Sequence, residues 1–152
     1  MSVDILGELL SNSVLWASIC SWAIAQFIKI LIELAKTKKI NTALIVSSGG
    51  MPSSHSSFVT AMTMSIGLKE GFNSSIFALS AVFSLVVMYD AAGVRRAAGY
   101  QAAAINMLFE RLEDQGIKLD KKLKELLGHS PIEVAAGAIL GILVAIATVY
   151  IV

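Results

Sequence analysis

Two histidines are the residues best suited to chemistry, and the first lies in a segment typical of a helix start. Residues 50–55 read GMPSSH, where proline fits a first helical turn and serine caps well. The free amides and positive dipole end of such a start suit an anion, and Ser53 and Ser54 add hydroxyl donors. His55 could protonate a leaving oxygen near neutral pH. The same residues also fit a serine-capped helix whose histidine has no chemical role.

His129 precedes a second helix start, in the segment GHSPIEVAAG of residues 128–137. Ser130 as N-cap, Pro131 at the first helical position and Glu133 three residues beyond the cap form a capping box. This box explains Ser130 and Glu133 without any chemistry, but it does not explain His129. A carboxylate one turn away can also hold an imidazole in one tautomer and raise its nucleophilicity. His129 and Glu133 are therefore a candidate nucleophile and its orienting group.

Three cations and one carboxylate could complete a phosphate site. Arginine's planar fork matches the oxygens of a phosphate, which makes Arg95 and Arg96 candidate ligands. Asp90 could pair with either arginine and hold it in place, although one of the two also fits a basic anchor at a membrane interface. Lys29 could bind phosphate, pair with Glu33 on the same helical face, or extend to the interface.

These side chains must be positioned by helices that cross a membrane. Of the 152 residues, 56% are hydrophobic and 15% charged, and the mean hydropathy is +0.75, whereas soluble domains carry about 25% charged residues. The pattern predicts one all-α domain over residues 1–152, a polytopic membrane helical bundle with about four crossing segments plus one amphipathic helix. The crossings are expected at Val14–Leu34, Pro52–Leu68, Ser74–Ala92 and Pro131–Val152, and the amphipathic helix at Gly99–Leu112.

Some of these boundaries allow more than one interpretation. The Pro52–Leu68 segment is short for a crossing and also fits a re-entrant helix. Residues 93–96, GVRR, interrupt the third apolar run and predict a break before the amphipathic helix. Residues 115–124 are polar and predict a surface loop or a short exposed helix.

Composition also excludes several classes of protein. The formal net charge of +1 gives no basic excess with which to bind nucleic acid. A single cysteine, Cys20, cannot form an internal disulfide. The two histidines are far apart in the sequence and no Cys/His spacing predicts a metal site, so no metal or cofactor is expected.

Positive charges predict the orientation of the bundle. Lys36, Lys38 and Lys39 follow the first crossing, and positively charged loops tend to stay in the cytoplasm. Four successive crossings then bring His55, His129 and the other candidate residues to one membrane face. The sequence therefore predicts an integral, multi-pass membrane protein with its site on the cytoplasmic face.

Small residues line one face of the first and of the last crossing. They are Ala17, Ser21 and Ala25 in the first, and Gly137, Gly141 and Ala145 in the last. Such faces let helices approach closely, either within one chain or between two copies in a homo-oligomer. Packing within one chain is the simpler interpretation.

Taken together, these motifs resemble the type 2 phosphatidic acid phosphatases, which belong to the acid phosphatase and vanadium-dependent haloperoxidase superfamily. The resemblance rests on PSSH at residues 52–55, VMYDAAGVRR at 87–96, GYQA at 99–102 and GHSPIEVAAG at 128–137. From about residue 26 to residue 143 the chain is similar to the divergent branch of small membrane proteins in that superfamily.

The resemblance implies a role for each matching residue. His129 is the nucleophile that its motif contributes, and Glu133 is the carboxylate that orients it. His55 is the general acid, while Ser53 and Ser54 line the phosphate cradle.

The chain also departs from the superfamily's motifs. Ser54 replaces a glycine, Glu133 replaces an aspartate, and the arginine expected shortly before the nucleophile is missing. A motif of lysine followed at fixed spacing by Arg-Pro is absent too, and Lys29 is the one candidate for its lysine. Arg95 and Arg96 are the arginines that remain for the guanidinium role.

The predicted function is hydrolysis of a lipid phosphate or diphosphate through a phosphohistidine. The expected partners are the bilayer and a phosphorylated lipid of the phosphatidate, phosphatidylglycerol phosphate or polyprenyl diphosphate class. The alternative is a non-catalytic membrane protein that binds or transports a phosphorylated lipid or a small anion. The missing arginine motifs favour this alternative, whereas His55, His129 and Glu133 favour the enzyme.

Overall fold

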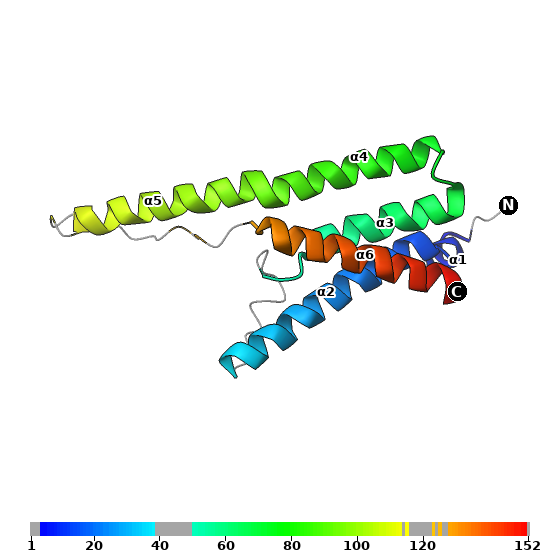
Figure 1. The fold of residues 1–152 in the computed structure, drawn as a ribbon, viewed down its shortest axis with the longest axis horizontal. Helices are drawn as coiled ribbons and strands as arrows, with labels where there is room; N and C mark the ends of the chain where they lie inside the picture. The colour runs from blue at the N-terminus through cyan, green and yellow to red at the C-terminus, as the bar shows by residue number, and fades with distance from the viewer. Residues whose placement is uncertain are drawn as a thin grey trace.

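The computed structural model describes residues 4–38, 50–113, 115, 123, 125 and 128–151. Every regular element within these ranges is a helix, which confirms the all-α fold. Lys39 and most of the polar segment 115–124, including its lysines, lie outside the described residues. Figure 1 shows the helices gathered into a bundle from which α5 extends well beyond the others.

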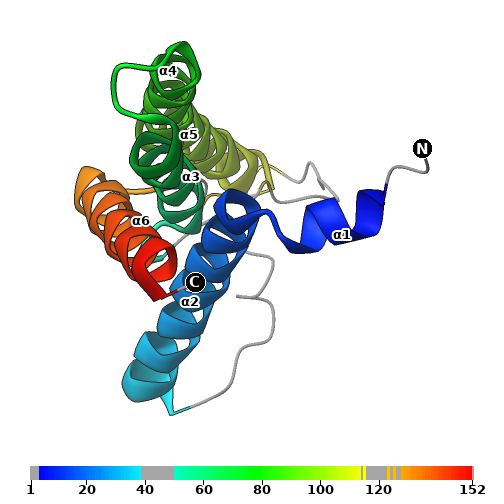
Figure 2. The same ribbon diagram turned by 90° about the vertical axis from the view of Figure 1, so that its right-hand side faces the viewer.

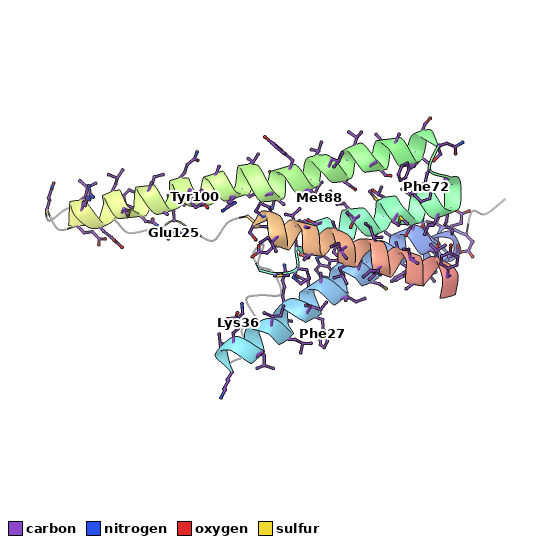
Figure 3. The ribbon with its side chains drawn as sticks, viewed as in Figure 1. Phe27, Lys36, Phe72, Met88, Tyr100 and Glu125 are labelled. Carbon is purple, nitrogen blue, oxygen red and sulfur yellow. The ribbon has the colours of Figure 1, made fainter. Side chains whose placement is uncertain are left out.

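The chain enters the bundle through a short helix and a long one. Helix α1 spans Ile5–Leu10, and its four large apolar side chains are exposed; Figure 2 shows it projecting away from α2. Helix α2 spans Ser13–Thr37, where Asn12 caps its first turn by accepting a hydrogen bond from the Leu15 amide at 3.0 Å. At 25 residues α2 is about 37 Å long. Its C-terminal end, which carries Lys36, diverges from the bundle (Figure 3).

Helix α3, Ser54–Glu70, occupies the centre of the bundle and packs against α2, α4 and α6. Its hydroxyl groups reach backbone carbonyls of those neighbours. Thr60 donates to Ala138 O at 3.2 Å, and Thr63 donates to Ser80 O at 3.0 Å. Because protein surrounds this helix, several of its hydroxyl groups bond to backbone carbonyls instead of water, and the helix needs less apolar surface than one facing lipid.

Helix α4, Ser75–Tyr89, does not end where a break is expected. The chain continues through a single π-helical turn, η2, at Asp90–Val94 and directly into α5, Arg95–Glu113. The prediction of a break at residues 93–96 is therefore wrong. The helix takes in one extra residue in a wider turn and continues. Together the three elements form a rod of 39 residues, about 58 Å long, which exceeds the roughly 30 Å of a bilayer's hydrocarbon core.

Three described helices are long and apolar enough to cross a membrane: Ser13–Thr37, Ser75–Glu113 and Pro131–Tyr150. The last belongs to α6, Pro131–Ile151. The sequence predicts a fourth crossing in α3, but with 17 residues α3 is not among the three. Side chains on α4 such as Leu79, Val82 and Leu85 are at least 60% exposed, as expected of a surface that faces lipid.

The small-residue faces are used within the chain. A Cβ added to Gly137 would overlap the Ser53 carbonyl and lie 3.0 Å from Ser56 Cβ, so α6 sits directly on the start of α3. From α2, Ser21 is fully buried and donates to Ser57 O at 3.1 Å. Packing within one chain is the arrangement that the sequence favours, and it occupies these faces.

Candidate functional site

The two histidines lie together at one end of the bundle. His55 is in the first turn of α3 and His129 stands two residues before α6. Their ring centroids are 5.8 Å apart, with the ring planes inclined at 78°. The starts of α3 and α6 are joined directly, because the Ser53 amide donates to Glu133 O at 2.9 Å. Helix packing therefore brings together two residues that are far apart in the sequence.

The ring nitrogens of this pair are available to a ligand. His129 is 1% exposed, yet neither of its ring nitrogens has a hydrogen-bond partner among the described residues. The same holds for Nδ1 of His55. Buried polar atoms in folded proteins are nearly always paired with protein or ordered water. Three such atoms on two neighbouring rings make this pair a candidate site for a polar ligand.

His129 is uncharged at neutral pH. Burial lowers the pKa of its imidazole to about 4, and the nearby positive charges of Lys29 and Arg95 act in the same direction. A neutral imidazole keeps one nitrogen lone pair free. This ring can therefore act as a nucleophile at pH 7 without first losing a proton.

Lys29 provides a buried cation beside the histidines. Its side chain is 3% exposed, which excludes an extension to the membrane interface, and Nζ donates to Ser54 Oγ at 3.2 Å. Within the described ranges it forms no ion pair with Glu33 or any other carboxylate. An ammonium group buried with a single hydroxyl partner requires compensation by an anion. Lys29 is therefore a candidate ligand for a phosphate.

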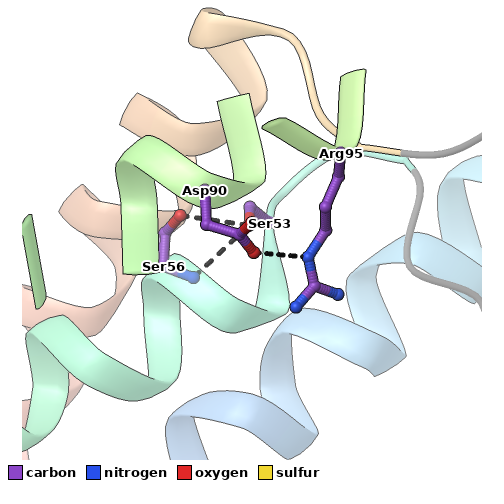
Figure 4. A network of polar contacts seen from close by, with 4 residues as sticks. All are labelled: Ser53, Ser56, Asp90 and Arg95. Carbon is purple, nitrogen blue, oxygen red and sulfur yellow. Dashed lines mark hydrogen bonds and ion pairs between the residues drawn. The ribbon is translucent and has the colours of Figure 1, made fainter. Parts of the chain in front are cut away.

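Arg95 and Arg96 point to different partners. Arg95 Nε donates to Asp90 Oδ2 at 2.6 Å, and Figure 4 shows this ion pair beside the first turn of α3. Arg96 Nε donates to the Tyr100 hydroxyl at 3.0 Å, and its guanidinium lies 5.5 Å from the centre of that ring. Tyr100 is exposed. Arg95 is the arginine near the histidines, while Arg96 has the surroundings of an interface anchor.

The two serines at the start of α3 have different hydrogen-bond partners. Ser53 is the N-cap, since its Oγ accepts from the Ser56 amide at 3.3 Å and from Ser56 Oγ at 3.0 Å (Figure 4). Ser54 accepts from Lys29 instead. Ser54 is therefore the hydroxyl that joins the helix start to the buried cation.

Glu133 takes the structural role that the sequence also allows. Its carboxylate accepts from the Ser130 amide at 3.1 Å, and the Glu133 amide donates to Ser130 Oγ at 3.3 Å. These two hydrogen bonds confirm the capping box. In the described part of the chain no hydrogen bond joins this carboxylate to His129. The predicted orienting contact is not formed in this structure, where Oε2 of the carboxylate caps the helix.

A backbone contact that the sequence does not reveal holds His129 instead. The His129 amide donates to the Ala91 carbonyl, in the π-helical turn η2, at 2.9 Å. Gly128, just before it, has φ of +82°, and a Cβ there would lie 2.8 Å from Arg96 Cα. The glycine is required both for its backbone conformation and for this close approach.

The described residues contain no group of three or more His, Cys, Asp or Glu side chains that could hold a metal ion. Lys29, Arg95 and the amides at the start of α3 are the described groups that could stabilise negative charge at the site. The arrangement combines a neutral buried imidazole, a second imidazole facing it and two cations. Such a site can bind a phosphate group and offer it both a nucleophile and a proton donor.

Comparison with known proteins agrees with these observations. The family described as "Divergent PAP2 family" matches residues 10–144. A relative described as the uncharacterized membrane protein YuiD of Bacillus subtilis (strain 168) is 44% identical over 154 residues, covering 94% of this chain and 98% of the relative. No solved structure matches the chain significantly. With three helices able to span a bilayer, the protein is an integral membrane protein. It belongs to the Divergent PAP2 family.

Proposed function

We propose that this protein is a membrane phosphatase that removes phosphate from a lipid phosphate or diphosphate through a phosphohistidine intermediate. The observation that carries the proposal is the pair of facing imidazoles, with three buried ring nitrogens unpartnered among the described residues. Lys29 and Arg95 supply positive charge at the same place. Family membership supports a relationship to phosphatidic acid phosphatases.

In the first step a lone pair of His129 forms a bond to phosphorus. The bond from phosphorus to the leaving oxygen breaks, and its electron pair stays on that oxygen. Protonated His55 donates its proton to the leaving oxygen, which departs as an alcohol or, from a diphosphate, as a phosphate. Lys29 and Arg95 stabilise the charge on the remaining phosphoryl oxygens.

In the second step water hydrolyses the phosphohistidine. His55, now neutral, accepts a proton from water as the water oxygen bonds to phosphorus. The bond between phosphorus and nitrogen breaks, and its electron pair returns to His129. Inorganic phosphate leaves, and both histidines return to their starting protonation states.

Lipid phosphates are the substrates that fit this location. The site lies at one end of a bundle whose outward side chains on α2 and α4, such as Phe27 and Leu79, are apolar and exposed. A phosphate at the bundle end can bind with its acyl or prenyl chain still in the bilayer. Phosphatidate, phosphatidylglycerol phosphate and polyprenyl diphosphates all have this form.

Phosphate release by the purified protein from a panel of lipid phosphates tests the proposal. His129→Ala should lose turnover with every substrate. His55→Ala should lose about 10²- to 10⁴-fold with alkyl phosphates, whose leaving oxygen needs a proton. With an aryl phosphate, whose leaving group departs unaided, the first step should be damaged much less.

The phosphoenzyme distinguishes the two roles. His55→Ala lacks the base for hydrolysis, so it should accumulate acid-labile, base-stable phosphate on His129. Phosphoenzyme that persists in His129→Ala but disappears in His55→Ala would show that the roles are reversed. Absence of turnover with every lipid phosphate by the unmodified protein would reject the enzyme.

A second candidate function has one observation in its favour. The Glu133 carboxylate caps α6 and does not contact His129, so the predicted orienting pair is not formed. A non-catalytic protein that binds or transports a phosphorylated lipid or anion needs the cations and amides but no oriented nucleophile. Saturable binding of a lipid phosphate without phosphate release would favour this second function.

We also propose that the site faces the cytoplasm. The end of α2 carries Lys36 and Lys38, and the rod of α4 and α5 carries Arg95 and Arg96, so basic residues gather at the end of the bundle that holds the histidines. Basic residues next to a crossing favour the cytoplasmic side. In Figure 1 the end of α2 and the start of α6 both lie toward the same side of the molecule.

A further inference from the structure

The π-helical turn η2 changes the hydrogen-bond partner of one backbone carbonyl, that of Ala91. In an α-helix the Arg95 amide would donate to the Ala91 carbonyl, four residues earlier. Here the Arg95 amide donates to the Asp90 carbonyl, five residues earlier. The Ala91 carbonyl accepts instead from the His129 amide at 2.9 Å. The extra residue in the turn thus provides the acceptor that anchors His129.

The side chains across the turn depend on the same geometry. Residues five apart on an α-helix point about 140° away from each other. Asp90 Oδ2 and Arg95 Nε are nevertheless only 2.6 Å apart, because the wider turn brings residue 95 back over residue 90. Their ion pair therefore links the first residue of the π turn to the residue that follows it, on the outer face of the helix. An α-helical turn at this point would separate the two side chains.

The chain before His129 packs on the turn's far end. A Cβ at Gly128 would lie 2.9 Å from the Arg95 carbonyl carbon and 2.8 Å from Arg96 Cα. Residue 128 is therefore in direct contact with the backbone where η2 becomes α5. Two consecutive residues, Gly128 and His129, are seated against η2 and the first residues of α5.

From these contacts we infer that η2 is a positioning device for His129, in which Ala91 anchors the residue by its carbonyl and Asp90 stabilises the turn by pairing with Arg95. The functional meaning rests on the proposed role of His129 as nucleophile. The device replaces the carboxylate contact that Glu133 does not make. The same turn also fixes the positions of both the proposed nucleophile, His129, and the proposed phosphate ligand, Arg95. π-helical turns inside α-helices occur frequently at functional sites.

Hydrogen exchange of the histidine amides tests this inference without any phosphate chemistry. The chain has only two histidines, so selective ¹⁵N-histidine labelling of the full-length protein in micelles gives two backbone signals. The His55→Gln variant assigns them. Two test variants are Asp90→Asn, which removes the ion pair, and deletion of Ala92, which removes the extra residue. Tyr100→Phe is the matched control, because it alters the Arg96 contact on the same helix.

Exchange of the His129 amide should become about fivefold faster in Asp90→Asn and at least about tenfold faster in the Ala92 deletion. The His55 amide should be unchanged, and Tyr100→Phe should change neither signal. Unchanged His129 exchange in both test variants would overturn the inference. Equal acceleration of both histidine amides would also overturn it, because it would show general loosening of the bundle.

Phosphate release separates this inference from the proposed function. If the unmodified protein releases no phosphate but the His129 amide loses protection as expected, the anchor stands and the phosphatase fails. If the unmodified protein is active and both test variants retain full turnover with protected His129, the anchor fails and the phosphatase stands. In an active protein, Asp90→Glu should restore part of the turnover that Asp90→Asn loses.

Discussion

Replacing Gly137 by alanine should separate α6 from the start of α3. The added Cβ would overlap the Ser53 carbonyl and lie 3.1 Å from its carbon, closer than ordinary van der Waals contact. The obstructing atoms are backbone, so no side-chain rotation relieves the overlap and the helices must move apart. Overpacking of this kind costs about 1–3 kcal/mol. The higher helix propensity of alanine offsets about 1 kcal/mol of this, so we expect a net loss of up to about 2 kcal/mol.

Gly93→Ala is the matched control for this change. The atom nearest to a Cβ at Gly93 is Tyr89 Cε1 at 4.0 Å, an ordinary contact distance. The same glycine-to-alanine substitution there should leave the free energy of unfolding unchanged or raise it by up to about 1 kcal/mol. Both variants gain the helix propensity of alanine, but only Gly137→Ala creates an overlap. The difference between their free energies of unfolding therefore measures the cost of the overlap.

Unfolding in mixed micelles of dodecylmaltoside and sodium dodecyl sulfate, followed by far-ultraviolet circular dichroism, measures both free energies. The separation of α6 from α3 in Gly137→Ala should also weaken anion binding at the site, because Ser53 caps α3 and its amide bonds to Glu133 on α6. Vanadate binding to Gly137→Ala should therefore be weaker than to Gly93→Ala. If Gly137→Ala matches Gly93→Ala in both stability and vanadate binding, α6 does not pack against the start of α3 as closely as the structure indicates.

Three further predictions concern charge. Arg95→Ala should weaken vanadate binding about 10- to 100-fold and Arg96→Ala little, because only the former loses a charged ligand; equal effects would contradict this division. Since the pKa of His129 is about 4 in the fold and about 6.5 unfolded, stability should be complete above pH 6.5. The contribution of His129 should fall with acidification by up to about 1.4 kcal/mol per pH unit down to pH 4, and His129→Gln should remove that contribution in unfolding measurements. For orientation, a cysteine placed at Lys38 in a Cys20→Ser background should resist an impermeant maleimide on intact cells while one at Glu70 reacts, and the reverse pattern would invert the topology.

The sequence by itself determined the local structure of the site. Whether a helix starts at residue 54 or 131 depends on hydrogen bonds within four residues, so the serine cap and the capping box with Glu133 are legible in the sequence. The close packing of Gly137 is legible too, since small residues at four-residue spacing leave one helix face open to a neighbour.

Only the tertiary structure decided which distant groups meet and which are buried. The facing of His55 and His129 and the burial of Lys29 follow from how α2, α3 and α6 pack, and no local pattern encodes that packing. The division between Arg95 and Arg96 depends on the π turn, because one extra residue rotates everything after it. Periodicity assumes a constant rise and rotation per residue. It therefore predicts a break at the very turn that presents the Ala91 carbonyl to His129.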